Sequence, residues 1–204
     1  MVNNLREEFG DIDIYLFDQL LKGRIDNSKR ILDAGCGAGR NLTYFLKNGF
    51  DIYAIEKNHD LLERVKNFAR EMAPQLSREN FKLGAVENIP FADNEFDIVI
   101  SNAVLHFAAN KQHFDEMLFS MWRVLKGGGF LFVRLASIIG IENEVKPLGS
   151  GRYLIPDGSE RYLVDQKILL DYTLQLGGKL IENIKTTNVQ NLRCMTTWCL
   201  TKCA

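Results

Sequence analysis

Three glycines at alternating positions constrain the fold of this chain more than any other sequence feature. Gly35, Gly37 and Gly39 follow the short apolar segment 30–33, which ends in Asp33, and they precede a segment with helical periodicity. Glycine permits a tight turn and lets the backbone approach a ligand closely. Free N–H groups at the start of the next helix can bind an anionic group. The pattern predicts a strand, a ligand-binding loop and a helix, which together begin a Rossmann-like α/β domain.

Apolar runs alternate with helical stretches along the rest of the chain. We predict strands at residues 30–33, 51–55, 81–84, 97–101 and 130–135, and helices at residues 40–47, 59–73, 111–126 and 166–176. Parallel strands joined by crossover helices produce this alternation. The last two β-rich segments, 179–188 and 193–201, are joined by too few residues for a crossover helix, so they should pair antiparallel.

The length of 204 residues fits one domain, so we predict a single domain over residues 1–204. Residues 1–27 include a stretch with helical periodicity, and we expect them to form an N-terminal helical cap over the ligand crevice. Residues 136–163 are interrupted by glycines and prolines. They predict an irregular loop or lid on the substrate side of the domain.

The composition excludes several classes of partner. Lys and Arg total 25 against 26 Asp and Glu, so no basic excess indicates a nucleic acid or an anionic membrane. Residues 1–10 lack the apolar run of a signal peptide, so we expect a cytoplasmic protein. The four cysteines show no C-x-x-C spacing, and we therefore expect no metal.

Two classes of cofactor are compatible with the glycine loop alone. The dinucleotide fingerprint needs a glycine at position 40, where this chain has Arg40. The carboxylate of Asp33 would repel a pyrophosphate, whereas it would attract an ammonium or sulfonium group. These features favour S-adenosyl-L-methionine. An NAD-type dinucleotide oxidoreductase and a non-catalytic S-adenosylmethionine-binding module are the alternatives.

Residues 31–40, with the sequence ILDAGCGAGR, resemble motif I of the class I S-adenosylmethionine-dependent methyltransferases. Residues 87–91 and 96–101 are similar to the family's link into strand four, and residues 122–129 to its junction with strand five. The likeness runs in order over residues 30–135. It implies a Rossmann-like three-layer sandwich with a seven-stranded, mostly parallel sheet and an antiparallel C-terminal strand. It also implies methyl transfer to a small-molecule acceptor, with S-adenosyl-L-homocysteine as product. Tellurite-resistance-like and type 11 or type 25 methyltransferases are of this small-molecule type.

The resemblance also implies which residues bind the cofactor. Glu56 ends the second strand about 20 residues after the glycines, where the family places an acid on the ribose hydroxyls. Many relatives carry Asp two residues before Glu87, and this chain has Ala85 there. Adenine recognition should therefore depend on backbone groups around Val86 or on Glu87. The predicted cofactor-binding residues are Asp33, Gly35, Cys36, Gly37, Glu56, Lys57, Val86, Glu87 and Asn102.

Residues after strand four lie at the edge of the sheet where acceptor and methyl group would meet. Asn102 and His106 are in this place, and His106 is the candidate general base for a hydroxyl or thiol acceptor. The alternative is a packed or cofactor-contacting histidine. His59 and His113 are predicted to lie at the surface.

Three residues of the later part of the chain are candidates for substrate binding. Arg134, Arg152 and Tyr153 lie on or near the irregular segment and could select an anionic or aromatic acceptor. Arg40 is either solvated or placed beside the ligand carboxylate. No [Asp/Asn]-Pro-Pro-aromatic motif follows strand four and no cysteine follows a proline, which disfavours enzymes that methylate DNA amino groups or the cytosine ring.

Overall fold

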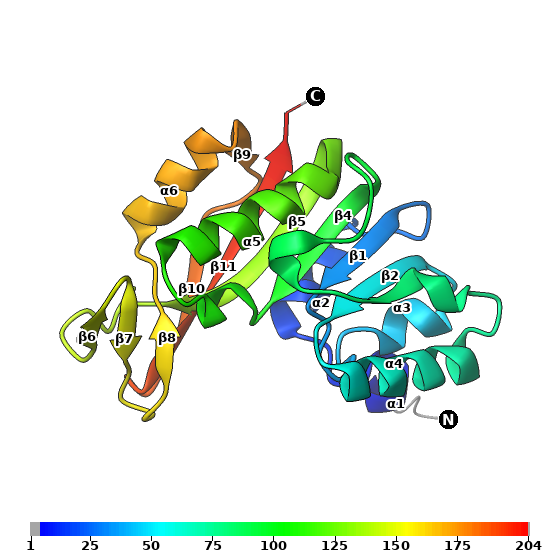
Figure 1. The fold of residues 1–204 in the computed structure, drawn as a ribbon, viewed down its shortest axis with the longest axis horizontal. Helices are drawn as coiled ribbons and strands as arrows, with labels where there is room; N and C mark the ends of the chain where they lie inside the picture. The colour runs from blue at the N-terminus through cyan, green and yellow to red at the C-terminus, as the bar shows by residue number, and fades with distance from the viewer. Residues whose placement is uncertain (1–4, 204) are drawn as a thin grey trace.

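A mostly parallel sheet forms the centre of the structure, a computed structural model that describes residues 5–203 (Figure 1). Its strands are β1 (Arg30–Ala34), β2 (Asp51–Glu56), β3 (Phe81–Leu83), β4 (Phe96–Asn102), β5 (Leu125–Ser137), β9 (Gly178–Leu180), β10 (Lys185–Val189) and β11 (Arg193–Lys202). The strand order is β10-β11-β5-β4-β1-β2-β3, and β9 also pairs with β11. Neighbours from β3 to β5 are parallel, whereas β11 is antiparallel to β5 and β10. The predicted fold class is confirmed, with β9 as an additional strand.

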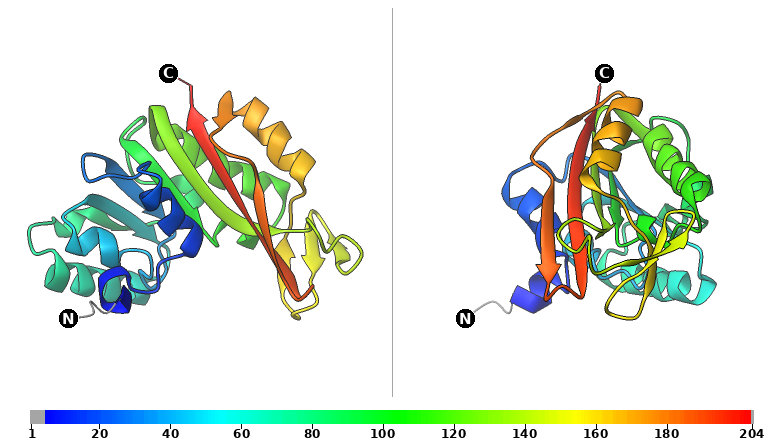
Figure 2. Two further views of the ribbon diagram at one scale, coloured as in Figure 1. Left: turned by 180° about the vertical axis from the view of Figure 1, so that it is seen from behind. Right: turned by 90° about the vertical axis from the view of Figure 1, so that its left-hand side faces the viewer.

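Helices cover both faces of this sheet. They are α1 (Leu5–Phe9), α2 (Ile14–Leu21), α3 (Thr43–Lys47), α4 (His59–Met72), α5 (Lys111–Val124) and α6 (Gln166–Gln175), with 3-10 turns η1 (Arg78–Asn80), η2 (Val86–Asn88) and η3 (Leu105–Phe107). One hydrophobic core holds α2, α3 and α4 against the sheet, and a second holds α5 and α6 against its other face. Seen from behind, α2 crosses in front of the sheet (Figure 2).

Side-chain caps begin the helices that the sequence predicts. Asn58 Oδ1 accepts hydrogen bonds from the N–H groups of Asp60 and Leu61 at the start of α4. Asp165 Oδ1 accepts one from Ile168 N–H at the start of α6. Such caps satisfy N–H groups that have no partner within the helix.

The glycine block at residues 127–129 lies inside a strand and does not end a helix. We predicted a helix to residue 126 and a strand from residue 130, but α5 ends at Val124 and β5 begins at Leu125. The register between β4 and β5 shifts at this point, which marks a bulge. A Cβ on Gly129 would lie 3.0 Å from the Asp97 carbonyl oxygen and 2.8 Å from that of Lys126. Gly129 therefore lets β5 pass close to its neighbour.

The segment 136–163 forms strands as well as loops. A separate antiparallel sheet contains β6 (Lys146–Gly149), β7 (Arg152–Leu154) and β8 (Glu160–Tyr162). It projects from the end of the main sheet, below the start of α6 in Figure 1. Of the glycines that predicted an irregular loop, Gly151 and Gly158 lie between the strands of this small sheet and Gly149 ends β6, and all three have positive φ angles. Of the predicted N-terminal cap, residues 1–4 lie outside the described residues.

Candidate functional site

A cavity of about 380 Å³ opens at the carboxyl ends of β1, β2 and β4. This is the edge where ligands bind in open α/β sheets. Its lining includes all the predicted cofactor-binding residues except Asp33, namely Gly35, Cys36, Gly37, Glu56, Lys57, Val86, Glu87 and Asn102. Asp33 lies buried beside it in β1. In residues 5–203, no three His, Cys, Asp or Glu side chains gather as a metal-binding group.

The glycine loop takes a backbone conformation that requires glycine. Gly35 has a φ of +86°, and a Cβ there would lie 2.8 Å from Cγ2 of Val104. The N–H groups of Gly35 and Cys36 both donate to the Ile55 carbonyl, each at 3.0 Å. These bonds hold the loop against β2. Residues of the loop form part of the cavity wall.

Glu56 is fixed by two backbone donors, one in the glycine loop and one just after β2. Its Oε2 accepts from Gly37 N–H at 2.9 Å, and its Oε1 accepts from Asn58 N–H at 2.8 Å. A carboxylate oxygen has two lone pairs, so each oxygen can accept a further bond from a ligand hydroxyl. The side chain is buried and lines the cavity.

Asp33 is a buried carboxylate with an unsatisfied oxygen. The residue is 1% exposed, and its Oδ2 has no hydrogen-bond partner. Burial raises the pKa of Asp33 from 3.8 to about 7; Glu56 adds to the rise and Arg40 opposes it. A buried acceptor without a partner is costly, and a cationic ligand group would satisfy it.

The cysteine of the loop is unreactive in this environment. Cys36 is buried, and its Sγ lies 3.8 Å from the Gly37 carbonyl oxygen. Burial, with the nearby charges of Asp33 and Glu56, strongly raises the pKa of its thiol. The thiolate form that would act as a nucleophile is therefore disfavoured.

The end of β4 brings polar groups and backbone strain to the cavity. Asn102 Oδ1 accepts from Arg40 Nη2 at 3.0 Å, whereas its buried Nδ2 has no partner. The next residue, Ala103, has a φ of +62°, an uncommon conformation for a residue with a Cβ. Arg40, which the sequence left open between solvent and ligand, lines the cavity.

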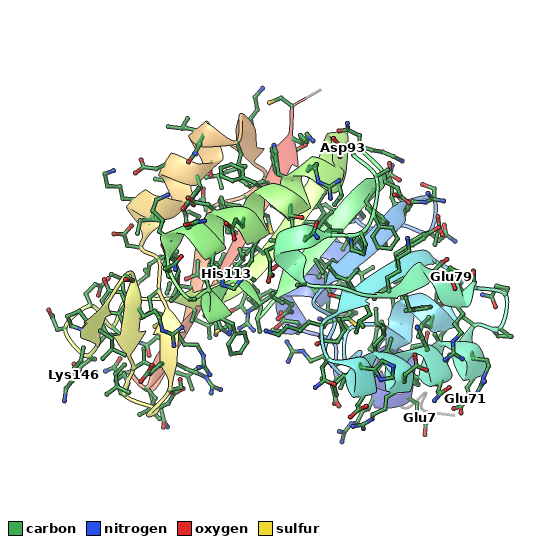
Figure 3. The ribbon with its side chains drawn as sticks, in the orientation of Figure 1. Glu7, Glu71, Glu79, Asp93, His113 and Lys146 are labelled. Carbon is green, nitrogen blue, oxygen red and sulfur yellow. The ribbon has the colours of Figure 1, made fainter. Side chains whose placement is uncertain are left out.

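His113 is half-buried and lines the cavity, whereas the sequence predicts only a surface residue. Its Nδ1 accepts from Ala109 N–H at 3.1 Å, and its Nε2 lies 3.5 Å from Glu87 Oε2. In Figure 3 it occupies the middle of the view, whereas Glu71 and Lys146 lie at the rim. Met117, one helical turn further along α5, also lines the cavity. Only the docking of α5 next to η2 brings these side chains to the cavity.

His106 is buried in η3 and does not line the cavity. Its Nδ1 accepts a hydrogen bond from Ala136 N–H at 3.1 Å. In a neutral imidazole the other nitrogen then carries the proton, so the ring has no free lone pair to act as a base. Burial lowers the pKa of His106 from 6.5 to about 4, and the charge of Arg161 contributes. This geometry favours the packed-histidine alternative.

Replacing His106 by asparagine should reduce the loss of folding stability that accompanies a fall in pH from 6.5 to 4. Between pH 6.5 and 4 the unfolded imidazole binds a proton while the folded one stays neutral, so wild-type stability falls as the pH falls. The loss amounts to about 3 kcal/mol over that range. Urea denaturation at several pH values would measure it. The exposed His59→Asn variant is the control, and an unchanged slope for H106N would contradict the assignment.

Two predicted substrate residues, Arg152 and Tyr153, make contacts of the small sheet and do not line the cavity. Arg152 Nη1 donates to the Ala108 carbonyl at 3.1 Å, and its Nη2 pairs with Glu160 at 3.4 Å. Tyr153 packs against the cluster that contains Ile155 and Leu163. These contacts attach β7 to the body of the domain. Arg134 also lies outside the cavity lining, where it forms an ion pair with Asp13.

The fold and the cavity define a class I S-adenosylmethionine-dependent methyltransferase. Similar proteins belong to the same class. A family model described as a methyltransferase domain matches residues 32–133. The chain therefore belongs to this methyltransferase family, whose cofactor is S-adenosylmethionine.

Similar sequences cover part of the chain. A malonyl-(acyl-carrier protein) O-methyltransferase of Enterobacter lignolyticus is 29% identical over 109 residues, which are 53% of this chain and 39% of that protein. The uncharacterized methyltransferase YodH of Bacillus subtilis is 33% identical over 119 residues, covering 57% and 44%. The matches span less than half the length of these relatives.

Solved structures share the fold over most of the chain. A SAM-dependent methyltransferase of Methanosarcina mazei has a TM-score of 0.72 at 17% identity, covering 90% of this chain and 97% of that one. The 1,6-didemethyltoxoflavin-N1-methyltransferase of Burkholderia thailandensis has a TM-score of 0.71 at 14% identity, covering 98% and 82%. At these identities the likeness establishes the fold alone.

Proposed function

We propose that this protein transfers the methyl group of S-adenosylmethionine to a small-molecule acceptor. The observation that carries the proposal is the unpartnered Oδ2 of Asp33 beside a cavity built from the glycine loop. A buried carboxylate at this point suits a ligand with an ammonium or sulfonium group, and it does not suit a pyrophosphate.

The chain's own groups fit the parts of this cofactor. Glu56 would accept from the ribose hydroxyls, because its two oxygens are already oriented by backbone N–H groups. Asp33 would pair with the ammonium group of the methionine part. Val86 and Glu87 would border the adenine, with His113 holding the Glu87 carboxylate. Lys57 lines the cavity on the ribose side, next to Glu56.

The protein's part in methyl transfer is to position the two reactants and to exclude water. S-adenosylmethionine, when bound, supplies an electrophilic methyl carbon. The strained turn at Ala103 and the side chains of Asn102 and Phe107 form the wall where an acceptor would approach. Correct positioning alone accelerates such a displacement strongly. We assign no general base, since His106 is committed to Ala136.

The charge balance of the chain supports a small acceptor. The net charge of −1 gives no basic excess of the kind that favours binding of a nucleic acid. In the part of the chain that the structure describes, no helix has the length and apolarity to cross a membrane. Of the similar proteins, one is named for methylating malonyl-(acyl-carrier protein) and one for methylating 1,6-didemethyltoxoflavin.

Methyl transfer is tested with cofactor carrying a labelled methyl group and fractionated metabolite pools. We expect label in a low-molecular-weight product, and thermal stabilisation by S-adenosylmethionine and S-adenosylhomocysteine but not by NAD. Stabilisation by NAD alone would overturn the cofactor assignment. Cofactor binding without any labelled product would indicate a binding module.

Replacing Glu56 by glutamine should weaken cofactor binding through the ribose. One side-chain oxygen is lost as an acceptor, so we expect roughly a 10-fold to 100-fold weaker Kd for S-adenosylhomocysteine by calorimetry. 5′-Methylthioadenosine, which keeps the ribose but lacks the amino-acid part, should lose affinity equally. The exposed Glu71→Gln variant is the control. A loss confined to S-adenosylhomocysteine would contradict the ribose assignment.

A further inference from the structure

Four neighbouring strands each carry a polar residue on the same face of the sheet, towards the end at which the cavity lies. Glu56 ends β2, Asp33 lies near the end of β1, Asn102 ends β4, and Arg134 of β5 pairs in register with Asn102. Apolar residues two positions earlier on each strand belong to the core with α2, α3 and α4, so these four side chains lie on that face. Along this row the charge changes from acidic at β2 and β1 to basic at β5.

The basic end of the row is a half-buried arginine with an unsatisfied nitrogen. The Arg134 side chain is 15% exposed, and its Nη1 donates to Asp13 Oδ2 at 2.6 Å. Its guanidinium lies 4.9 Å from the centre of the Tyr15 ring. The buried Nε has no hydrogen-bond partner, and neither has Nδ2 of the adjacent Asn102. Two unused donors therefore lie beside each other on neighbouring strands.

One carboxylate serves two guanidinium groups at this place. Asp13 Oδ2 also accepts from Arg40 Nη2 at 3.2 Å, and the ion pairs of Arg40 and Arg134 within residues 5–203 go to Asp13 alone. Asp13 caps α2, and its side chain is 3% exposed. Arg40 is 50% exposed and also lies near the Asp33 carboxylate, whereas the Arg134 side chain is 15% exposed and shares Asp13 with Arg40. An additional anion beside Arg134 would therefore be stabilised.

We propose that the methyl acceptor carries a carboxylate group, which binds Arg134 and Asn102 next to Asp13. The proposal rests on the proposed function and specifies its acceptor. A guanidinium binds a carboxylate through two parallel N–H bonds, and the side of Arg134 that does not face Asp13 offers the unused Nε together with Nη2. Asn102 Nδ2 adds a third donor, and Asn102 also lines the cavity. The carboxylate would thereby anchor the acceptor beside the point of methyl transfer.

Asp13 then acts as an internal competitor of the acceptor. It belongs to the segment between α1 and α2, and its negative charge beside both guanidinium groups would repel an acceptor carboxylate. Replacement by asparagine keeps a side-chain oxygen that can cap α2 but removes the negative charge between the two arginines. Asp13→Asn should therefore increase the affinity for a carboxylate, while Arg134→Gln should decrease it.

The test uses benzoate and its uncharged analogue benzamide as probes. Each is titrated into nitrogen-labelled protein saturated with S-adenosylhomocysteine, and binding is followed by NMR at Asn102 Nδ2 and Arg134 Nε. We expect preference for benzoate in the wild type. The Kd for benzoate should improve roughly threefold to tenfold in D13N and weaken at least about tenfold in R134Q. The exposed Arg193→Gln variant removes an equal charge elsewhere and should behave as wild type.

Two outcomes would overturn the proposal. The first is an equal response to benzoate and benzamide in both the wild type and D13N. The second is an R134Q variant that binds S-adenosylhomocysteine less tightly but 5′-methylthioadenosine normally, because Arg134 would then serve the cofactor's own carboxylate. If R134Q does not fold, the affinity of D13N for benzoate tests the proposal by itself, because this variant keeps a side-chain oxygen that can cap α2. A wild type that fails to bind S-adenosylhomocysteine would instead contradict the proposed function.

Discussion

Replacement of Asp33 by asparagine is expected to stabilise the ligand-free protein above pH 7 and to weaken cofactor binding. The pKa of Asp33 is about 7 in the folded chain, against an ordinary value of 3.8. Between these values the folded state holds a proton that the unfolded state has released, so wild-type stability falls as the pH rises. The full cost applies above pH 7 and is of order 2–4 kcal/mol. The neutral amide of the D33N variant carries no such cost.

Thermal unfolding of ligand-free protein at pH 5 and pH 8 would measure this effect. We expect the Tm of D33N to exceed that of wild type at pH 8 by roughly 5–15 °C, with a smaller difference at pH 5. The exposed Asp60→Asn variant is the control, since its carboxylate is solvated in both states. A Tm difference that does not depend on pH would show that Asp33 ionises normally.

The same variant should lose affinity for the amino-acid part of the cofactor. The unpartnered Oδ2 would pair with the ammonium group, so we expect S-adenosylhomocysteine to bind roughly 10-fold to 100-fold more weakly to D33N. 5′-Methylthioadenosine lacks that group and should bind D33N and wild type alike. Equal losses for both ligands would place Asp33 elsewhere in the site. Stability and binding thus change in opposite directions, as at many functional sites.

Replacement of Gly35 by alanine is expected to damage both the fold and the site. The φ of +86° disfavours any residue with a Cβ, and the added methyl would lie 2.8 Å from Val104 Cγ2. Val104 belongs to the cavity wall, so its displacement would change the site. We expect a loss of about 2–4 kcal/mol in the free energy of unfolding, together with loss of binding of both cofactor analogues.

Gly128→Ala provides a matched control for this variant. Gly128 has a φ of +75°, but nothing lies within 4 Å of the position of its Cβ. This variant should cost only the backbone strain, about 1 kcal/mol, and bind S-adenosylhomocysteine normally. Urea denaturation and calorimetry on both variants separate the cost of backbone strain from the cost of the steric contact with Val104. Equal destabilisation of the two variants would argue against the contact with Val104.

Local sequence patterns were sufficient where a feature depends on neighbouring residues. The glycine loop, the caps at Asn58 and Asp165 and the acid at the end of β2 follow from spacing, because turns and caps are formed by residues adjacent in the chain. The glycines at residues 127–129 misled the prediction of where β5 begins. They resemble a helix stop, but their function depends on β4, which the local sequence does not show.

The edge of the candidate site depends on contacts between distant segments. His113 reaches the cavity because α5 docks beside η2, and His106 is occupied by Ala136, 30 residues away. Arg134 meets Asp13 across 121 positions of the chain. No periodicity encodes such pairs, since each depends on how separate elements pack.

The sequence by itself therefore determined the class of fold, the cofactor loop and the acidic residues near the ends of β1 and β2. Local backbone geometry fixes the positions of three site residues. Gly35 lies in the glycine turn, and Asp33 and Glu56 lie at or near the ends of their strands. Only the tertiary structure decided which polar groups are left without a partner. Whether Asp33 Oδ2 or Arg134 Nε is satisfied depends on burial and on side chains that arrive from other elements, and that is a property of packing.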